Sequence, residues 1–179
     1  MSETGTSVKI GIDRIATPLG KMLMMVRGTA LVLLEFDDEG ERDLASFDVE
    51  ETANPCGYSD RIRAYFDGEL AAIDSIPTEG AGTPFQQRVW SELRRIPCGT
   101  TLSYGGLAER LGDKNLMRAV GLANGSNPIA VVVPCHRVIG ADGSLTGYGG
   151  GLPRKSWLLN HEGVPVRNGR IDRQGDLFE

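Results

Sequence analysis

The sequence contains few cysteines and histidines, which limits the kinds of site that it can build. Among its 179 residues there are three cysteines, Cys56, Cys98 and Cys135, and two histidines. An odd number of cysteines without a C-x-x-C pair is not the pattern of a disulfide framework or of a structural zinc site. We therefore expect reduced thiols and no bound metal.

Long apolar runs are also missing. No stretch approaches the roughly 20 consecutive apolar residues that a membrane-spanning helix needs. The first five residues have neither the basic start nor the apolar segment of a secretory signal. We therefore expect a cytoplasmic protein with no membrane partner. Hydrophobic residues make up 40% of the chain, enough to build a packed core.

The net charge of -5 is unevenly distributed along the chain. Residues 1–83 carry 7 Lys and Arg against 16 Asp and Glu, whereas residues 84–166 carry 9 against 5. A polyanion responds to the local charge that it meets rather than to the total. The second half can therefore face a polyanion although the whole protein is acidic.

The first third of the chain is typical of a small α/β domain. The apolar segments 22–26 and 30–36 flank a Gly-containing turn, which predicts a β-hairpin. Residues 60–68 have the apolar spacing of a helix with a terminal glycine. Residues 77–82 have linker composition, so we place the end of an N-terminal domain at residue 82.

The second half, residues 83–166, opens with strong helix signals. Thr83 is an N-cap candidate, Pro84 suits the first helical position, and Gln86 completes a capping box. Ser103 caps a second short helix, and a third is expected over residues 115–124 after a glycine-containing turn. The last two helices form a helix-turn-helix pattern in a mainly helical domain.

The third helix carries small residues around one long cation. Ala119 and Gly121 would let its backbone approach a sugar-phosphate surface closely, with Arg118 beside them. Glycine inside a helix costs about 1 kcal/mol relative to alanine, so Gly121 predicts a packing or contact requirement. Helix pairs of this spacing also occur in many proteins that bind no DNA, and the spacing alone leaves both readings open.

Cys135 lies in the most reactive-looking segment of the sequence. The apolar, β-branched residues 129–133 predict a buried strand that ends at Pro134, just before Cys135. His136 can take the thiol proton, and the positive charge of Arg137 would lower the thiol pKa. The alternative is a buried structural thiol, the usual fate of a single cysteine.

Residues 154–163 predict a helix that could complete this site. Near its end Glu162 could accept a hydrogen bond from His136 and orient it, or it could be a solvated helix-end charge. The glycine-rich residues 140–151 could cover a flat ligand with backbone N–H groups. Cys135, His136 and Glu162 would also suit a cysteine hydrolase, a different class of enzyme.

Several motifs, in order, resemble the O6-alkylguanine-DNA alkyltransferases, also called methylated-DNA–protein-cysteine methyltransferases. The resemblance is nearly continuous from Thr83 to about Gly163, and residues 1–82 resemble the family's N-terminal domain only loosely. The motifs are Ser103-Tyr104-Gly105, Arg118-Ala119-Val120-Gly121, Asn127-Pro128, Pro134-Cys135-His136-Arg137-Val138-Ile139-Gly140 and Leu158-Leu159-Asn160-His161-Glu162.

This resemblance implies both a fold and a reaction. The fold is a ribonuclease-H-like α/β domain, here residues 1–82, followed by a mainly helical domain, residues 83–166, whose helix-turn-helix enters the DNA minor groove. The reaction is irreversible transfer of an alkyl group, such as methyl, from O6 of guanine in duplex DNA to Cys135, with O4 of thymine as a further site. The damaged base is flipped out, each molecule acts once as a monomer, and no cofactor is used. We expect residues 167–179 to be a flexible tail.

The resemblance also implies roles for individual residues. Cys135 matches the nucleophile, His136 a base acting through water, and Glu162 the carboxylate that orients it; Asn127 supports this network, and Tyr104 donates to the flipped base. Arg118 matches the residue that fills the gap left in the duplex. Further DNA-binding positions are Ser103, Tyr104, Ala119 and Gly121, and further pocket positions are Val138, Tyr148, Gly149 and Gly150.

Two comparisons with the family matter for the interpretation. Family members often have small residues just before the arginine, whereas Leu116 and Met117 stand there in this chain. Alkyltransferase-like proteins, which bind alkylated DNA without reacting, lack the nucleophilic cysteine. The presence of Cys135 favours a transferase over such a non-catalytic binder.

Overall fold

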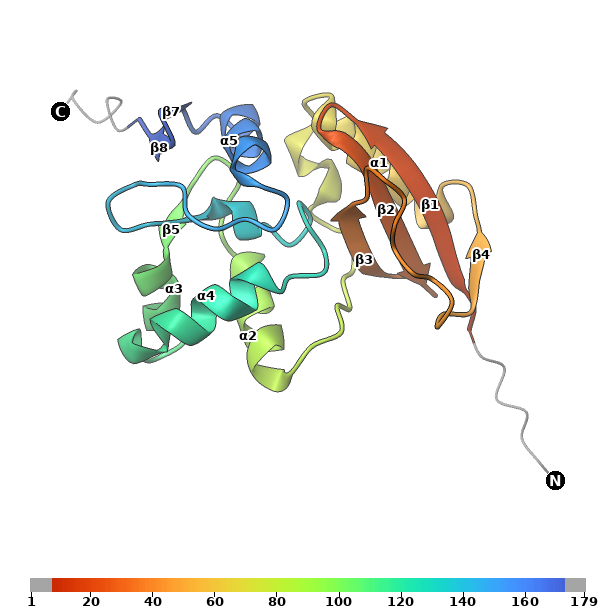
Figure 1. The fold of residues 1–179 in the computed structure, drawn as a ribbon, viewed down its shortest axis with the longest axis horizontal. Coiled ribbons are helices and arrows are strands. Elements are labelled where there is room, and N and C mark those ends of the chain that lie inside the picture. Colours follow the sequence, from red (N-terminus) through yellow and green to blue (C-terminus); the bar gives the residue numbers. More distant parts are fainter. Residues whose placement is uncertain (1–7, 173–179) are drawn as a thin grey trace. The chain divides into compact units, whose positions relative to one another are not determined.

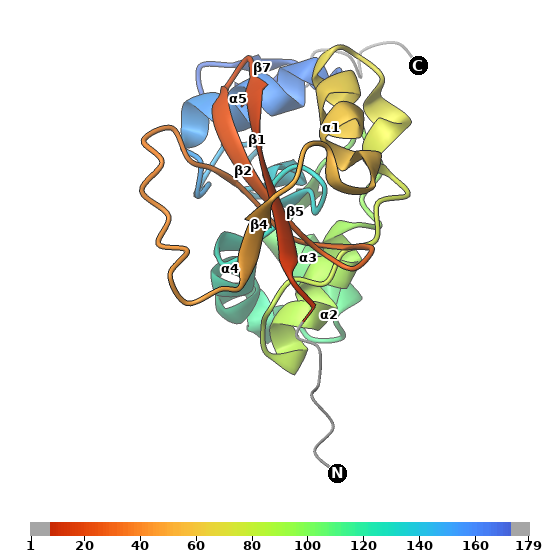
Figure 2. The same cartoon turned by 90° about the vertical axis from the view of Figure 1, so that its right-hand side faces the viewer.

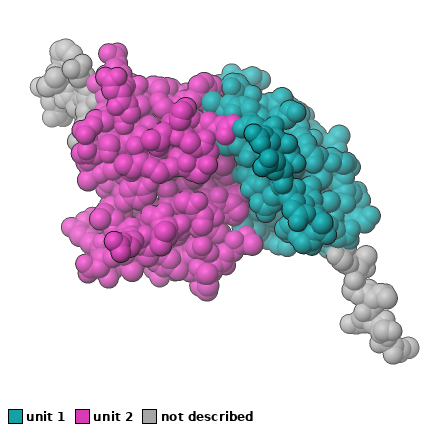
Figure 3. Space-filling view, viewed as in Figure 1, with its two compact units in different colours: residues 1–80 teal, residues 81–179 magenta. Residues whose placement is uncertain are grey.

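The computed structural model describes residues 8–172, which belong to two compact units, Met1–Gly80 and Ala81–Glu179 (Figure 3). Over the described residues, the first unit is a sheet with one α-helix and two 3-10 turns, and the second is mainly helical. This division confirms the coarse prediction of an α/β part followed by a helical part. Within residues 8–172 no helix is both long enough and apolar enough to span a membrane.

The sheet of the first unit has four strands in the order β3-β2-β1-β4. They are β1 (Ile10–Thr17), β2 (Gly20–Arg27), β3 (Ala30–Phe36) and β4 (Val49–Glu51). The predicted hairpin is the antiparallel pair β2–β3, while β4 pairs with β1 in parallel.

Helix α1 (Tyr58–Phe66) packs against β1 (Figures 1 and 2). It begins two residues before the predicted start and buries Ile62, Tyr65 and Phe66, as its apolar spacing predicted. Leu44, in the acidic segment between β3 and β4, packs against a cluster of buried sheet residues. The middle of β2 is buried at every position from Met22 to Val26.

The described part of the second unit, up to residue 172, is built from four α-helices, short strands and 3-10 turns. The helices are α2 (Pro84–Leu93), α3 (Tyr104–Arg110), α4 (Met117–Gly125) and α5 (Leu152–His161), and β5 (Leu102–Ser103) pairs in parallel with β6 (Val138–Ile139). The capping box of Thr83 and Gln86 and the Ser103 cap are confirmed. The third predicted helix begins at Met117 instead of 115, because Asp113 caps a separate 3-10 turn, η3 (Lys114–Leu116).

The prediction of a strand over residues 129–133 is wrong. Four of these residues are buried and Ala130 is half-buried, but residues 130–132 form turns, and Val131 has a left-handed φ of 69°. The Asn127 carboxamide donates to the carbonyls of Ile129 and Val133 and accepts from the Ile129 N–H. A side chain thus satisfies backbone groups that a neighbouring strand would otherwise bond.

The segment predicted to be flexible from residue 167 is partly ordered. Strands β7 (Val166–Arg167) and β8 (Arg170–Ile171) form a hairpin, and Val166 and Ile171 pack against a buried cluster. This hairpin also bonds the glycine-rich loop through Ile171 N to Gly143 O and Leu145 N to Gly169 O. Residues 173–179 of the predicted tail lie outside the described residues.

Candidate active site

Cys135 is the first residue of η4 (Cys135–Arg137), a single 3-10 turn that leads directly into β6. Its side chain is almost enclosed, with 7% of the residue exposed. The turn before it is fixed by the 2.7 Å hydrogen bond from Asn127 Nδ2 to the Val133 carbonyl, and the turn after it by the pairing of β6 with β5. The thiol is therefore held on a rigid backbone between two anchored segments.

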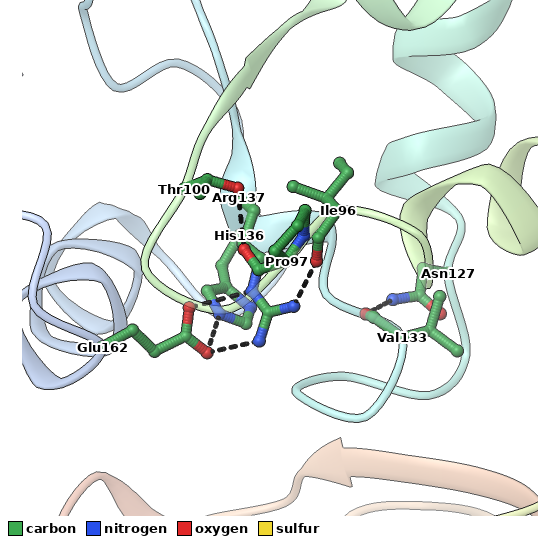
Figure 4. Close-up of polar contacts among 8 residues, drawn as sticks. All are labelled: Ile96, Pro97, Thr100, Asn127, Val133, His136, Arg137 and Glu162. Atoms are coloured by element: carbon green, nitrogen blue, oxygen red, sulfur yellow. Dashed lines mark hydrogen bonds and ion pairs between the residues drawn. The ribbon is translucent and has the colours of Figure 1, made fainter. Parts of the chain in front are cut away.

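The next two residues converge on the Glu162 carboxylate at the end of α5 (Figure 4). His136 Nε2 lies 2.9 Å from Oε1, and Arg137 donates from Nε to Oε2 and from a terminal nitrogen to Oε1, both at 2.9 Å. Arg137 also donates to the Ile96 carbonyl at 2.6 Å. The predicted contact of Glu162 with His136 is present, and Glu162 is buried instead of being a solvated helix end.

These contacts fix the charge states of the pair. Burial raises the pKa of Glu162, but hydrogen bonds from His136 and Arg137 outweigh it and hold that pKa well below its usual range. Burial lowers the pKa of His136 more than Glu162 raises it, so the imidazole is neutral at pH 7. An ionised carboxylate requires a proton on Nε2, which leaves Nδ1 as the basic nitrogen. Nδ1 is buried and has no hydrogen-bond partner among residues 8–172.

The positive charge that acts on the Cys135 thiol comes from Lys155 and not, as the sequence had predicted, from Arg137. Burial raises the pKa of its thiol, and the Asn127 side chain and the positive charge of Lys155 act in the opposite direction. Arg137 is instead bonded to Glu162 in a near-bidentate ion pair. The expectation that Arg137 activates the thiol is therefore wrong, and at rest the thiol stays protonated.

Lys155 on α5 is the residue that sequence reasoning missed. Its side chain is fully buried, and Nζ donates to the carbonyls of Val138 at 2.6 Å, Thr146 at 3.0 Å and Gly147 at 3.3 Å. Burial lowers its pKa to about 8, partly offset by Cys135. A signal was available, because Lys155 stands seven residues before Glu162 and three before Leu158, which places it on the inner face of the helix.

Two tyrosines from different segments lie near the thiol. Tyr104, the first residue of α3, donates from its hydroxyl to the Thr146 carbonyl at 3.0 Å. Tyr148 has a buried hydroxyl without a hydrogen-bond partner in the described chain. Burial, followed by smaller influences that include the charge of Cys135, raises the pKa of both phenols, so both remain protonated and able to donate.

The other predicted pocket residues surround the same backbone. Val138 is buried and follows η4 directly, and its carbonyl is held by Lys155. Gly149 and Gly150 belong to the glycine-rich loop before α5, and a Cβ added at Gly149 would meet open space. This structure thus brings Tyr104, Val138 and the loop together with Cys135.

The predicted DNA-contacting residues on α4 form a separate group. Arg118 is exposed and has no polar partner within residues 8–172, and a Cβ added at Gly121 or at Gly125 would meet nothing within 4 Å. Ala119 is partly buried, and Ser103 caps α3. Internal packing therefore does not require a glycine at position 121.

Comparison with known proteins identifies the family to which the chain is similar. A family model described as "6-O-methylguanine DNA methyltransferase, DNA binding domain" matches residues 84–164. The methylated-DNA–protein-cysteine methyltransferase of Shigella flexneri is 49% identical over 161 residues, covering 84% of this chain and 94% of the relative. That of Mycobacterium tuberculosis (strain ATCC 25618 / H37Rv) is 45% identical over 148 residues, covering 83% and 89%.

Solved structures give the same result for the fold. The crystal structure of the M. tuberculosis O6-methylguanine methyltransferase superposes with a TM-score of 0.75 at 41% identity, covering 89% of this chain and 96% of that one. A structure of the M. tuberculosis protein in complex with DNA also has a TM-score of 0.75, at 43% identity, covering 85% and 92%.

The fold and the site thus define a DNA-repair transferase. The chain belongs to the family of methylated-DNA–protein-cysteine methyltransferases, which confirms the resemblance and the enzyme class predicted from its motifs.

Proposed function

We propose that this protein repairs DNA by transferring an alkyl group from O6 of guanine to Cys135 in a single irreversible reaction. The observation that carries the proposal is the buried thiol followed directly by His136, whose ring is fixed by Glu162 at 2.9 Å. A cysteine of merely structural role has no need of a neutral, oriented imidazole beside it.

The resting charge states suit a nucleophile that is activated only when the substrate is bound. His136 Nδ1 takes the thiol proton, directly or through a water molecule, because the imidazole is neutral and Nε2 is occupied by Glu162. The Cys135 thiolate attacks the alkyl carbon, and the C–O6 bond breaks with its electron pair on oxygen. The departing guanine takes up one proton and His136 gives one up, so that the imidazole is neutral again and charge is conserved. Water does not hydrolyse the resulting thioether, so each molecule acts once.

Lys155 supplies positive charge to this step. Its ammonium group favours the thiolate over the thiol and offsets part of the effect of burial on the Cys135 pKa. With a pKa of about 8, Lys155 is mostly protonated at neutral pH. The Asn127 side chain also lowers the pKa of the thiol, and it holds the turn before Cys135.

The alkylated base leaves the stacked bases of the duplex to enter the pocket beside Cys135. An alkylated guanine inside a duplex cannot reach a buried thiol, so it is flipped into the pocket formed by Val138, Tyr148, Gly149 and Gly150. The Tyr104 hydroxyl donates to the base and stabilises the charge that develops as O6 departs. O4-alkylthymine reacts by the same displacement.

The DNA surface is formed by α3 and α4, which act as a helix-turn-helix. Arg118 is exposed and unpaired within the described chain, and the open positions at Gly121 and Gly125 allow close approach to a minor groove. Arg118 fills the gap left by the flipped base, with Ser103 and Ala119 as further contacts. The first unit has the ribonuclease-H-like fold of the family's N-terminal domain. A monomeric, cytoplasmic protein without metal or cofactor remains our prediction.

The mass of the intact protein tests this proposal. After incubation with a duplex containing one O6-methylguanine, one added methyl group is expected on the wild-type protein and on Cys98→Ala, but none on Cys135→Ala. Repeated turnover with an unmodified protein would instead indicate a hydrolase, and tight binding with neither result would indicate a non-catalytic binder.

A further inference from the structure

The Thr146 carbonyl accepts hydrogen bonds from two side chains that come from different helices. The Tyr104 hydroxyl, at the start of α3, and the Lys155 ammonium, on α5, both lie 3.0 Å from it. Lys155 also holds the carbonyls of Val138 and Gly147, which flank the site. One ammonium group therefore ties the backbone after the nucleophile to the glycine-rich loop.

This use of a lysine is unusual. A fully buried ammonium normally pairs with a carboxylate, yet within residues 8–172 none pairs with Lys155, and all three of its recorded acceptors are backbone carbonyls. An ammonium has three donor protons, and the three carbonyls use all of them. The arrangement fixes loop geometry to a degree that an apolar side chain could not.

Unlike Lys155, Tyr104 can donate only one hydrogen bond at a time. A phenol has a single donor proton, and in the free protein Tyr104 uses it on Thr146. To donate to a base, the hydroxyl must release that carbonyl. A carbonyl oxygen has two lone pairs, so it stays bonded after one donor leaves only if a second donor is in place.

We propose that Lys155 is a positioning residue that keeps the Thr146 carbonyl bonded while the Tyr104 hydroxyl changes partner from this carbonyl to the flipped base. The inference rests on the proposed function, in which Tyr104 donates to the base. Because Lys155 still holds Thr146 and Gly147, the loop keeps its conformation during the exchange. Without this second donor, the exchange would leave the Thr146 carbonyl without a donor from the protein once the bound base shields it from water.

The test must separate this role from the effect of the Lys155 charge on the thiol. We therefore use a Cys135→Ser background, in which no thiolate forms and no alkyl group is transferred. Binding is measured to a duplex with one O6-methylguanine and to the same duplex with guanine, and the lesion preference is the ratio of the two dissociation constants.

In this background Tyr104→Phe and Lys155→Met are each expected to lower the lesion preference by about three- to tenfold, the range of one net hydrogen bond. The double variant should be no worse than Tyr104→Phe alone, because a phenylalanine has no hydroxyl to move. Losses that multiply, or an unchanged preference in Lys155→Met, overturn the proposal. An unchanged preference in Tyr104→Phe overturns it together with the assigned role of Tyr104, whereas methyl transfer by the wild-type protein is tested independently.

A second measurement avoids substituting Lys155. Labelling with ¹³C-carbonyl threonine and ¹⁵N-glycine selects the Thr–Gly pairs, which are Thr4–Gly5 and Thr146–Gly147 in this chain. In the Cys135→Ser protein, the lesion duplex is expected to move the Thr146 carbonyl resonance to the position that it has in free Tyr104→Phe. Thr4–Gly5 serves as the internal control. A Thr146 resonance that stays in place on lesion binding refutes the exchange.

Discussion

Replacing Glu162 with glutamine probes the network behind the nucleophile with almost no change of shape. The carboxylate accepts three hydrogen bonds at 2.9 Å, one from His136 and two from Arg137. A carboxamide places an NH₂ group, itself a donor, opposite one of these donors, so that hydrogen bond is lost. It also removes the negative charge that balances Arg137. Removing one partner of a buried ion pair costs about 3–5 kcal/mol. We expect the free energy of unfolding to fall by about 3 kcal/mol, or roughly 6–12 °C in Tm for a chain of this length.

The loss of activity should exceed what instability explains. With a carboxamide as partner, His136 Nε2 can accept a hydrogen bond, so the ring proton can move to Nδ1, which then no longer accepts the thiol proton. A general base contributes about 10²–10⁴-fold to a rate. We expect the single-turnover rate of methyl transfer to fall by at least about 10²-fold, and the pKa of Cys135 to rise.

The assay is rapid-quench transfer from a duplex with one O6-methylguanine, together with urea unfolding. Glu92→Gln is the matched control, because its partner Arg95 is 70% exposed and such surface pairs contribute about 0–1 kcal/mol. If Glu162→Gln loses stability as expected but transfers methyl within threefold of the wild-type rate, the proposed orientation of His136 by Glu162 is refuted.

Three further predictions concern the same site. Asn127→Ala should lower the free energy of unfolding by about 2 kcal/mol, because the Val133 carbonyl loses its donor, and should raise the pKa of the nucleophile, measured from the pH dependence of iodoacetamide labelling. Burial lowers the pKa of His136 in the folded protein, so the unfolded chain binds a proton more readily and the free energy of unfolding should fall as the pH drops below about 6.5. Urea unfolding from pH 5 to 8 measures this dependence. It should disappear in His136→Gln but persist in His161→Gln. Arg118→Ala should slow repair of duplex DNA more than reaction with a free O6-alkylated base, and equal losses on both substrates would contradict a role in base flipping.

Local signals in the sequence predicted local structure well. The caps at Thr83 and Ser103 involve residues only three apart, so their side-chain and backbone partners are fixed by short-range geometry. Residues 129–133 were assigned to the wrong element because apolar, β-branched composition reports burial rather than strand pairing. What bends this segment is the side chain of Asn127, whose three backbone bonds no periodic pattern reveals.

Most residues of the site were predicted from the sequence, but not all of the contacts between them. The order of the motifs was enough to bring His136 and Glu162 together, although 26 positions separate them. The direction of the Arg137 guanidinium was not predictable, since it depends on Ile96 and Glu162 from two other segments. Lys155 was missed because a lysine on a helix is expected at the surface, and only the helical spacing of its neighbours places it inside.

The enclosure of Cys135 has a consequence for how the protein survives in a cell. Soluble alkylating agents and oxidants react with exposed thiolates, and here the thiol is both shielded and kept protonated by its surroundings. A protein that can react only once is inactivated by any chance reaction at its sulfur. Burial therefore restricts which molecules can react with the thiol. It also lengthens the time for which the protein stays active, because the thiol remains unreacted until a base delivered by DNA reaches the pocket.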